Sequence, residues 1–154
     1  MVQRAMVLLC VCSLAVFMLG CGQTYELQSI TVSPTTANLE GYNATQVLTV
    51  TAHYSNTKTQ DVTANSTYQV SQATAGSDPN TPNGAVTVNN SGIVETSNSI
   101  WACTWRATQV GTSYTYGVTS PYIVTVKYSG FTTSTAVAVA SGPSCYDGIT
   151  YNHP

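Results

Sequence analysis

Short runs of alternating apolar and polar residues fill most of the chain after residue 26. An alternation with a period of two puts apolar side chains on one face of a β-strand and polar side chains on the other. Gly, Pro, Asn and Asp separate the runs, as turns between strands require. The pattern therefore predicts short strands rather than helices. The clearest runs are residues 30–33, 48–54, 86–88, 93–94, 122–128 and 132–139.

Two connections between these runs have the sequence of a tight turn. Residues 89–92 read Asn-Asn-Ser-Gly, and Ser129-Gly130 joins the last two runs as a hairpin turn would. Because each run is apolar on one face and rich in threonine on the other, a second sheet must cover the apolar face. We therefore predict an antiparallel β-sandwich. The residues expected in its core are Ile30, Val32, Leu48, Val50, Tyr122, Val124, Val126, Val137 and Val139.

Several pieces of the chain carry a family resemblance through their order and spacing. They are residues 27–34, Gly41 and residues 48–52, 61–63, 90–94, 124–126 and 137–139. Together they resemble the bacterial immunoglobulin-like domain of group 2, the invasin and intimin type. Over about residues 27–140 the resemblance implies an all-β, immunoglobulin-like Greek-key β-sandwich of about seven antiparallel strands. It implies a spacer, an adhesive or a carbohydrate-associated module, and no catalysis.

Two places inside this domain call for a separate interpretation. The chain departs from the family pattern between Ser97 and Pro121, where an inserted segment of about residues 97–121 forms either a decorated loop or an extra hairpin. Asp61 is followed closely by Thr63, a pattern in which the carboxylate caps backbone amides in a turn. We interpret Asp61 as a structural residue rather than a metal ligand.

The first 20 residues have the character of a leader. Arg4 is their only charged residue, and an apolar run interrupted by Ser13 follows it. One cation before a short apolar run is typical of a signal peptide, whereas a membrane-spanning helix needs about 20 apolar residues. We therefore predict that residues 1–20 are a signal peptide.

Residues 18–21, Met-Leu-Gly-Cys, resemble the lipobox of bacterial lipoproteins, although the Met and the Leu differ from the most usual residues. The resemblance implies lipidation of Cys21, with acyl chains such as palmitate, and a tether over residues 21–26. The alternatives are a simple secreted protein and an uncleaved leader. Gly22 replaces the Asp that often retains lipoproteins at the inner membrane. The expected location is the bacterial cell envelope, with the outer membrane or cell surface favoured.

Charged residues are scarce, at 6% of the chain. Without the leader, three cations oppose six acids, which gives a formal net charge of −3. Nucleic-acid binding requires clustered cations that neutralise phosphates. We therefore expect no nucleic-acid partner. The remaining cations are Lys58, Arg106 and Lys127.

Residues suited to catalysis are few. His53 lies in a predicted strand on its threonine-bearing face, and His153 lies next to the C-terminus. The sequence has neither a Gly-x-Ser-x-Gly elbow nor a His-Glu-x-x-His pattern, and its six acids are scattered. We predict no enzyme activity, no catalytic residue, no cofactor and no metal.

Cys103 and Cys145 are the remaining cysteines once the leader and Cys21 are set aside. An exported chain meets an oxidising environment, so we predict a disulfide between them; the ligands for a zinc site are too few. Such a bond would hold the C-terminal tail, residues 141–154, against the inserted segment. Neither cysteine lies in a predicted strand, so we expect both outside the core.

Aromatic residues gather in the inserted segment and suggest two functions. We expect one tryptophan to pack in the core and the tyrosines to fill strand faces, and the alternative is that the rings stack on sugars or contact proteins. The first hypothesis is a non-catalytic, lipid-anchored spacer or adhesive module whose partner is a surface protein or polysaccharide. The alternative is a glycan-binding module. The possible contact residues are Trp101, Trp105, Tyr114 and Tyr116.

Overall fold

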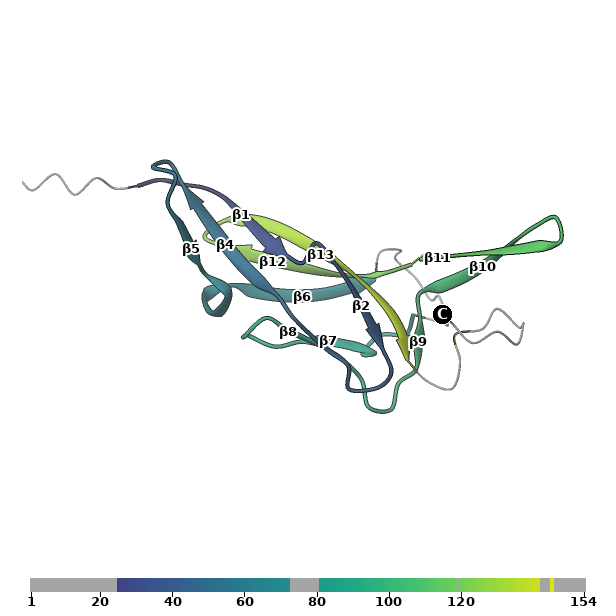
Figure 1. The fold of residues 1–154 in the computed structure, drawn as a ribbon. Coiled ribbons are helices and arrows are strands. Elements are labelled where there is room, and N and C mark those ends of the chain that lie inside the picture. The colour runs from purple at the N-terminus through teal and green to yellow at the C-terminus, as the bar shows by residue number, and fades with distance from the viewer. Residues whose placement is uncertain (1–24, 73–80, 119, 142–144, 146–154) are drawn as a thin grey trace, which may run out of the picture.

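The computed structural model describes residues 25–72, 81–118, 120–141 and 145, and it confirms an all-β fold arranged as a β-sandwich (Figure 1). Thirteen strands and one short 3-10 helix, Thr63–Asn65, lie in the described residues. The strands are β1 (Leu27–Ser33), β2 (Thr36–Glu40), β3 (Thr45–Val47), β4 (Thr49–Tyr54), β5 (Thr59–Asp61), β6 (Thr67–Gln72), β7 (Val86–Val88), β8 (Ile93–Thr96), β9 (Ala102–Cys103), β10 (Trp105–Val110), β11 (Ser113–Val118), β12 (Tyr122–Tyr128) and β13 (Phe131–Ser141).

One side of the fold consists of two three-stranded sheets that share one length of chain. The first sheet has the order β1-β4-β5 and the second the order β3-β8-β7, with all neighbours antiparallel. Between β3 and β4 lies only Leu48, which is fully buried. Its amide donates to the carbonyl of Gly92 at 2.8 Å, just before β8 begins. The residues 45–54 therefore pair first with β8 and then with β1.

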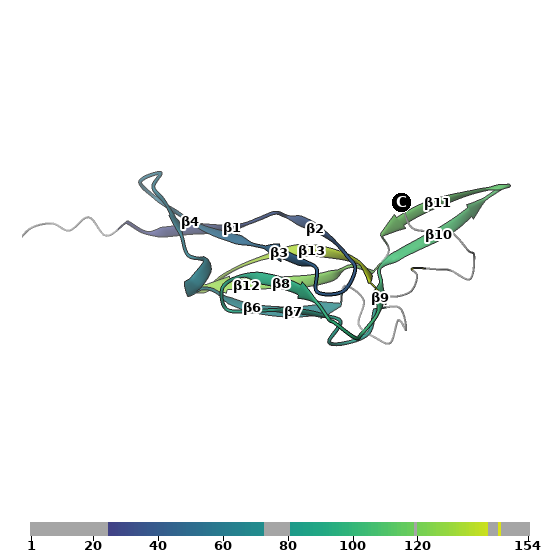
Figure 2. The same ribbon diagram turned by 60° about the horizontal axis from the view of Figure 1, so that its bottom comes forward.

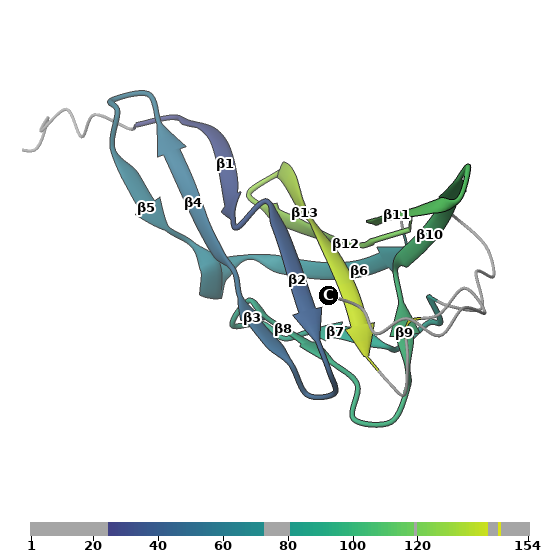
Figure 3. The ribbon, with the colours of Figure 1, turned by 45° about the vertical axis from the view of Figure 1, so that its right-hand side comes forward.

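The other sheet has the order β2-β13-β12-β6 (Figure 3). β12 is antiparallel to both β13 and β6, whereas β2 runs parallel to β13. β9 adds a short antiparallel pairing at the far end of β13, with Cys103 opposite Ala140. Because β1 and β2 belong to different sheets, the chain changes sheet between Ser33 and Thr36. The carbonyl of Pro34 at this crossing accepts a 2.8 Å hydrogen bond from the hydroxyl of buried Thr135.

The predicted core is confirmed. All nine residues expected from the alternation are buried and belong to one hydrophobic cluster that draws on both sides of the sandwich. Tyr122 is the largest of them, and its hydroxyl donates to the carbonyl of Pro82 at 2.9 Å, so its polar end is satisfied. The cluster also contains Val86 and Val94, which lie in predicted runs, and residues outside every predicted run, among them Ala37, Leu39 and Val62.

Both predicted turns are confirmed. β7 and β8 pair across residues 89–92, and the Asn89 side chain accepts hydrogen bonds from the amides of Ser91 and Ile93 at 2.9 and 3.0 Å. β12 and β13 pair across Ser129 and Gly130, both of which have positive φ, at 46° and 86°. Positive φ suits glycine, and it suits the two-residue hairpins whose twist matches that of the strands.

Asp61 has the structural role predicted for it. Its carboxylate accepts a 2.9 Å hydrogen bond from the amide of Thr63. The hydroxyl and the amide of Thr63 both lower the pKa of Asp61, the hydroxyl more strongly. The Thr63 hydroxyl also accepts from the amide of Val50 at 2.8 Å, and the Thr63 carbonyl accepts from the hydroxyl of Tyr68 at 2.8 Å. The turn after β5 is therefore tied to β4 and β6.

Candidate functional site

The inserted segment contains an extra hairpin, one of the two alternatives expected there. β10 and β11 pair only with each other along the described chain, in a register that sets Trp105 opposite Val118 and Val110 opposite Ser113. Gly111, with φ of 65°, opens the turn between them. Figures 1 and 2 show this hairpin extending away from the sandwich, at the opposite end from the start of β1.

Exposed apolar side chains concentrate around the hairpin. Of the seven large hydrophobic residues that are exposed in the described parts of the chain, four fall between residues 100 and 118. They are Ile100, Trp101, Val110 and Val118, with exposed fractions of 37, 39, 61 and 40%. Val110 lies beside the turn of the hairpin and Val118 at its base, opposite Trp105, so these side chains offer separate points of contact rather than one apolar patch.

The candidate aromatic residues have different surroundings. Trp101 is exposed just before β9, and Trp105 is half-buried at the base of β10. Neither tryptophan belongs to the core cluster as far as the structure describes it, so the expectation that one of them packs in the core is wrong. Tyr122 occupies that place instead. Tyr114 and Tyr116 lie on β11, and their side chains are outside the described part of the structure.

The predicted disulfide is present between Cys103 and Cys145, with their Cα atoms 5.1 Å apart. The expectation that both cysteines lie outside the core is wrong for Cys103, which is 2% exposed. The reason is β9, which pairs with the end of β13. Next to it, the hydroxyl of buried Thr104 accepts from the amide of Val139 at 2.8 Å. β9, at the base of the hairpin, is thus held to β13 by backbone pairing and linked by the disulfide to Cys145, four residues beyond the end of β13.

His53, the histidine considered for acid-base chemistry that the structure describes, lies on β4. Nε2 of His53 is hydrogen-bonded at 2.9 Å to the hydroxyl of Thr31, on the neighbouring strand β1. No group of three or more His, Cys, Asp and Glu side chains that could hold a metal ion occurs in the portion of the chain that the structure describes. Cys21 and His153 lie outside the described residues.

No protein-family model matches the chain, and no curated protein is significantly similar to it. Across residues 25–72, 81–118, 120–141 and 145, no helix has the length and apolar character needed to cross a membrane.

The sequence of the inserted segment contains a pattern that predicts this hairpin. Gly111-Thr112 separates two stretches, 105–110 and 113–118, that contain aromatic residues, valine and threonine. A glycine that opens a two-residue connection between such stretches predicts a hairpin. In the second stretch, Tyr114, Tyr116 and Val118 alternate with Ser113, Thr115 and Gly117, so the period of two is present in the sequence itself.

Proposed function

We propose that this protein is a non-catalytic, lipid-anchored module of the bacterial cell envelope. In this proposal, acylated Cys21 holds one end of the sandwich at a membrane, and the sandwich acts as a spacer. The hairpin end then contacts a surface protein or polysaccharide. The outer membrane or cell surface is the proposed location, as Gly22 favours.

The strand order supports an immunoglobulin-like topology for the spacer. Immunoglobulin domains of the constant type have strands A, B, E and D in one sheet and C, F and G in the other. β1, β3–β4, β8 and β7 are neighbours in the order of A, B, E and D. β6, β12 and β13 are neighbours in the order of C, F and G. In this correspondence β2 extends the sheet of β6, β12 and β13 beyond β13, and β5 lies beside β4 on the side away from β1.

The observation that carries the proposal is the arrangement of the two ends. The chain enters the sandwich at one end, whereas the hairpin and its exposed apolar residues lie at the other (Figure 1). β13 has 11 residues and runs from one region toward the other. At about 3.3 Å per residue it covers about 33 Å. An anchor at Cys21 would therefore attach the sandwich at the end that lies farthest from the hairpin.

Metabolic labelling with a fatty-acid probe tests the anchor. We expect the wild-type protein to be labelled and to fractionate with membranes. The Cys21→Ser protein should lose the label, because serine has no thiol to carry the acyl chain. Equal labelling of the two proteins would contradict the proposal.

A second candidate function is glycan binding by the aromatic residues at the hairpin end. The 39% exposure of Trp101 supports it, because an indole ring that is open to solvent can stack on a sugar. Binding on a glycan array that disappears in Trp101→Ala or Trp105→Ala, while the fold is retained, would favour this function over a protein contact.

A further inference from the structure

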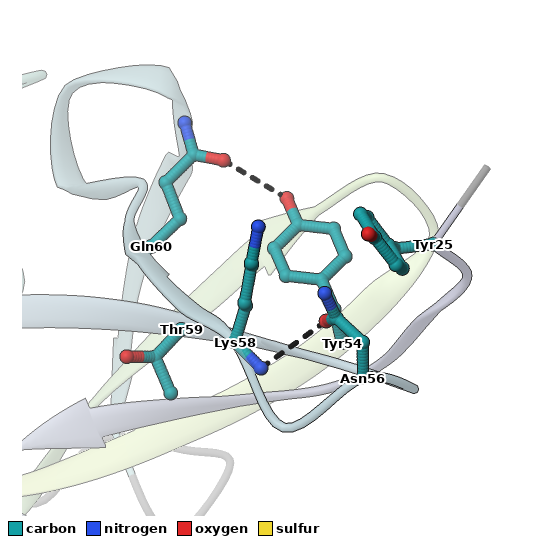
Figure 4. Close-up of a pocket in the computed structure, with 6 residues that line it drawn as sticks. All are labelled: Tyr25, Tyr54, Asn56, Lys58, Thr59 and Gln60. Atoms are coloured by element: carbon teal, nitrogen blue, oxygen red, sulfur yellow. Dashed lines mark hydrogen bonds between the residues drawn. The ribbon is translucent and has the colours of Figure 1, made fainter. Parts of the chain in front are cut away.

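A groove of about 460 Å³ lies at the end of the sandwich opposite the hairpin (Figure 4). It forms where the chain enters β1 and where β4 turns into β5. Its position and its side chains suggest a binding site that is separate from the hairpin. The residues that line it are Tyr25, Tyr54, Asn56, Lys58, Thr59 and Gln60.

The turn between β4 and β5 holds the lysine of this groove in place. The amide of Tyr54 donates to the carbonyl of Lys58 at 2.9 Å, and the side chain of Asn56 accepts from the amide of Lys58 at 3.1 Å. Thr57 completes the turn with φ of 65°. Lys58 is therefore presented at the tip of a turn that is closed by its own hydrogen bonds.

The segment before β1 is tied to the same turn. The amide of Ser55 donates to the carbonyl of Glu26 at 2.9 Å, and the amide of Glu26 donates to the hydroxyl of Ser55 at 3.2 Å. These bonds set Tyr25 beside the turn. The ammonium of Lys58 lies 5.1 Å from the centre of the Tyr25 ring, a cation–π distance.

The two tyrosines of the groove differ in their surroundings. Tyr54 packs against the core, and its hydroxyl donates to Gln60 at 3.1 Å. Tyr25 is 43% exposed. One side of the groove is thus the packed ring of Tyr54, and beside it lies the exposed ring of Tyr25 with the ammonium of Lys58 over it.

The covalent chain limits how far this groove can lie from Cys21. Tyr25 follows Cys21 by four residues. Four residues of extended chain span at most about 14 Å. If Cys21 is acylated, as the proposed function requires, the groove stays within that distance of the bilayer surface.

We propose that this groove docks on the phospholipid headgroup layer of the membrane that carries the anchor. Tyrosine rings favour the interface between water and lipid, with the ring in the apolar layer and the hydroxyl in water. The ammonium of Lys58 suits the phosphate that all phospholipid headgroups share. Glu26 offsets the charge of Lys58 at this end, so docking does not require anionic lipid. The anchor supplies the affinity, and the groove sets the orientation that points the hairpin away from the bilayer.

Amine labelling tests this docking, because the chain has two lysines, Lys58 and Lys127. The acylated mature protein is reconstituted in phosphatidylcholine vesicles and treated with an amine-reactive reagent. The Cys21→Ser protein, in buffer without vesicles, gives the reference ratio of Lys58 to Lys127 labelling. We expect this ratio to fall several-fold on the vesicles. Lys127, which is exposed on β12 and pairs with Thr132 near the start of β13, gives the comparison with a lysine that does not line the groove.

Tyrosine variants show whether the groove causes the protection. Each acylated variant is compared with its own Cys21→Ser form. Tyr25→Ala should restore Lys58 labelling while the protein stays on the vesicles. Tyr42→Ala should keep the protection, because Tyr42 is 40% exposed near the other end, next to Gly41, whose amide donates to the carbonyl of Ala140.

Three results would overturn the docking. An unchanged lysine ratio in acylated protein that remains on the vesicles would leave the anchor intact and remove the docking alone. Loss of protection in Tyr42→Ala as well as Tyr25→Ala would remove the groove as its cause. Protection of Lys58 by soluble oligosaccharides, without protection by vesicles, would identify a sugar site instead. Failure of Cys21 to carry fatty acid is a separate result, which removes the proposed function itself.

Discussion

The sandwich and the β10–β11 hairpin are both made of antiparallel strands, but they bury their side chains very differently. In the sandwich, Val124, Val126 and Val137 have no exposed surface. In the hairpin, Val110 is 61% exposed and Val118 is 40% exposed. The sandwich strands have a second sheet over their apolar face, whereas the hairpin strands pair only with each other in the described chain. Burial therefore stabilises the first region, and attachment at its base holds the second.

The attachment at the base should have the largest effect on stability. Cys103 and Cys145 are 42 residues apart, and closing a loop of this size stabilises a fold by about 4 kcal/mol on the chain-entropy model. We expect the Cys103→Ser/Cys145→Ser protein to keep its sandwich, with a lower melting temperature and faster proteolysis between residues 101 and 121. Circular dichroism melts and limited proteolysis measure the two effects. Cleavage at an unchanged rate would show that β9 alone fastens the hairpin.

Core truncation compares the two regions directly. Leu48→Ala removes a fully buried side chain from the sandwich and should lower the free energy of unfolding by about 3 kcal/mol. Val110→Ala, on the exposed hairpin, should change it by less than about 0.5 kcal/mol. Urea denaturation of both variants gives the two values. A similar loss in the free energy of unfolding for the two variants would contradict the exposed position of Val110.

Two glycines with left-handed backbone make a matched pair for the same comparison. A Cβ at Gly92, with φ of 74°, would lie 2.8 Å from the Thr63 methyl group and 3.0 Å from the Leu48 carbonyl oxygen. A Cβ at Gly111, with φ of 65°, would meet nothing within 4 Å. Gly111→Ala should therefore cost only about 1–2 kcal/mol for the backbone, and Gly92→Ala should cost more. Equal losses in thermal melts would contradict the close packing around Gly92.

The smallest expected effect is the dependence of stability on pH at Asp61. Hydrogen bonds from Thr63 lower the pKa of this carboxyl below its ordinary 3.8. The carboxylate therefore contributes its full stabilisation above pH 3.8 and loses it as the pH falls through the lower, folded-state pKa. Melting temperatures of the wild-type and Asp61→Asn proteins should converge as the pH is lowered below that value. A difference that stays constant down to pH 2 would exclude this role.

The sequence predicted the strands in which the alternation is long and missed those in which it is short. β4 and β12 alternate over six and seven residues with one face buried, so their period is clear. β2 and β6 were not predicted, because each contains only two alternating apolar residues, Ala37 and Leu39 in β2 and Tyr68 and Val70 in β6. A short alternation leaves a weak pattern.

Two features, one at each end of the molecule, could not be predicted from the spacing of residues along the sequence. The Cys103–Cys145 pair followed from counting cysteines, but the burial of Cys103 depends on the pairing of β9 with a strand that lies far along the chain. In the same way, Tyr25 and Lys58 meet only because Glu26 and Ser55 are hydrogen-bonded. Both features arise from tertiary pairing rather than from any local motif.

The central claim is that the chain is anchored at Cys21, at the end of the sandwich opposite the hairpin. The intact mass of the exported protein, measured without reductant, tests it most directly. The predicted mass is that of a chain that begins at Cys21, carries acyl groups and lacks the thiol hydrogens of Cys103 and Cys145. A chain that keeps residues 1–20, or one that begins at another residue without acyl groups, would contradict the anchor and the orientation that follows from it.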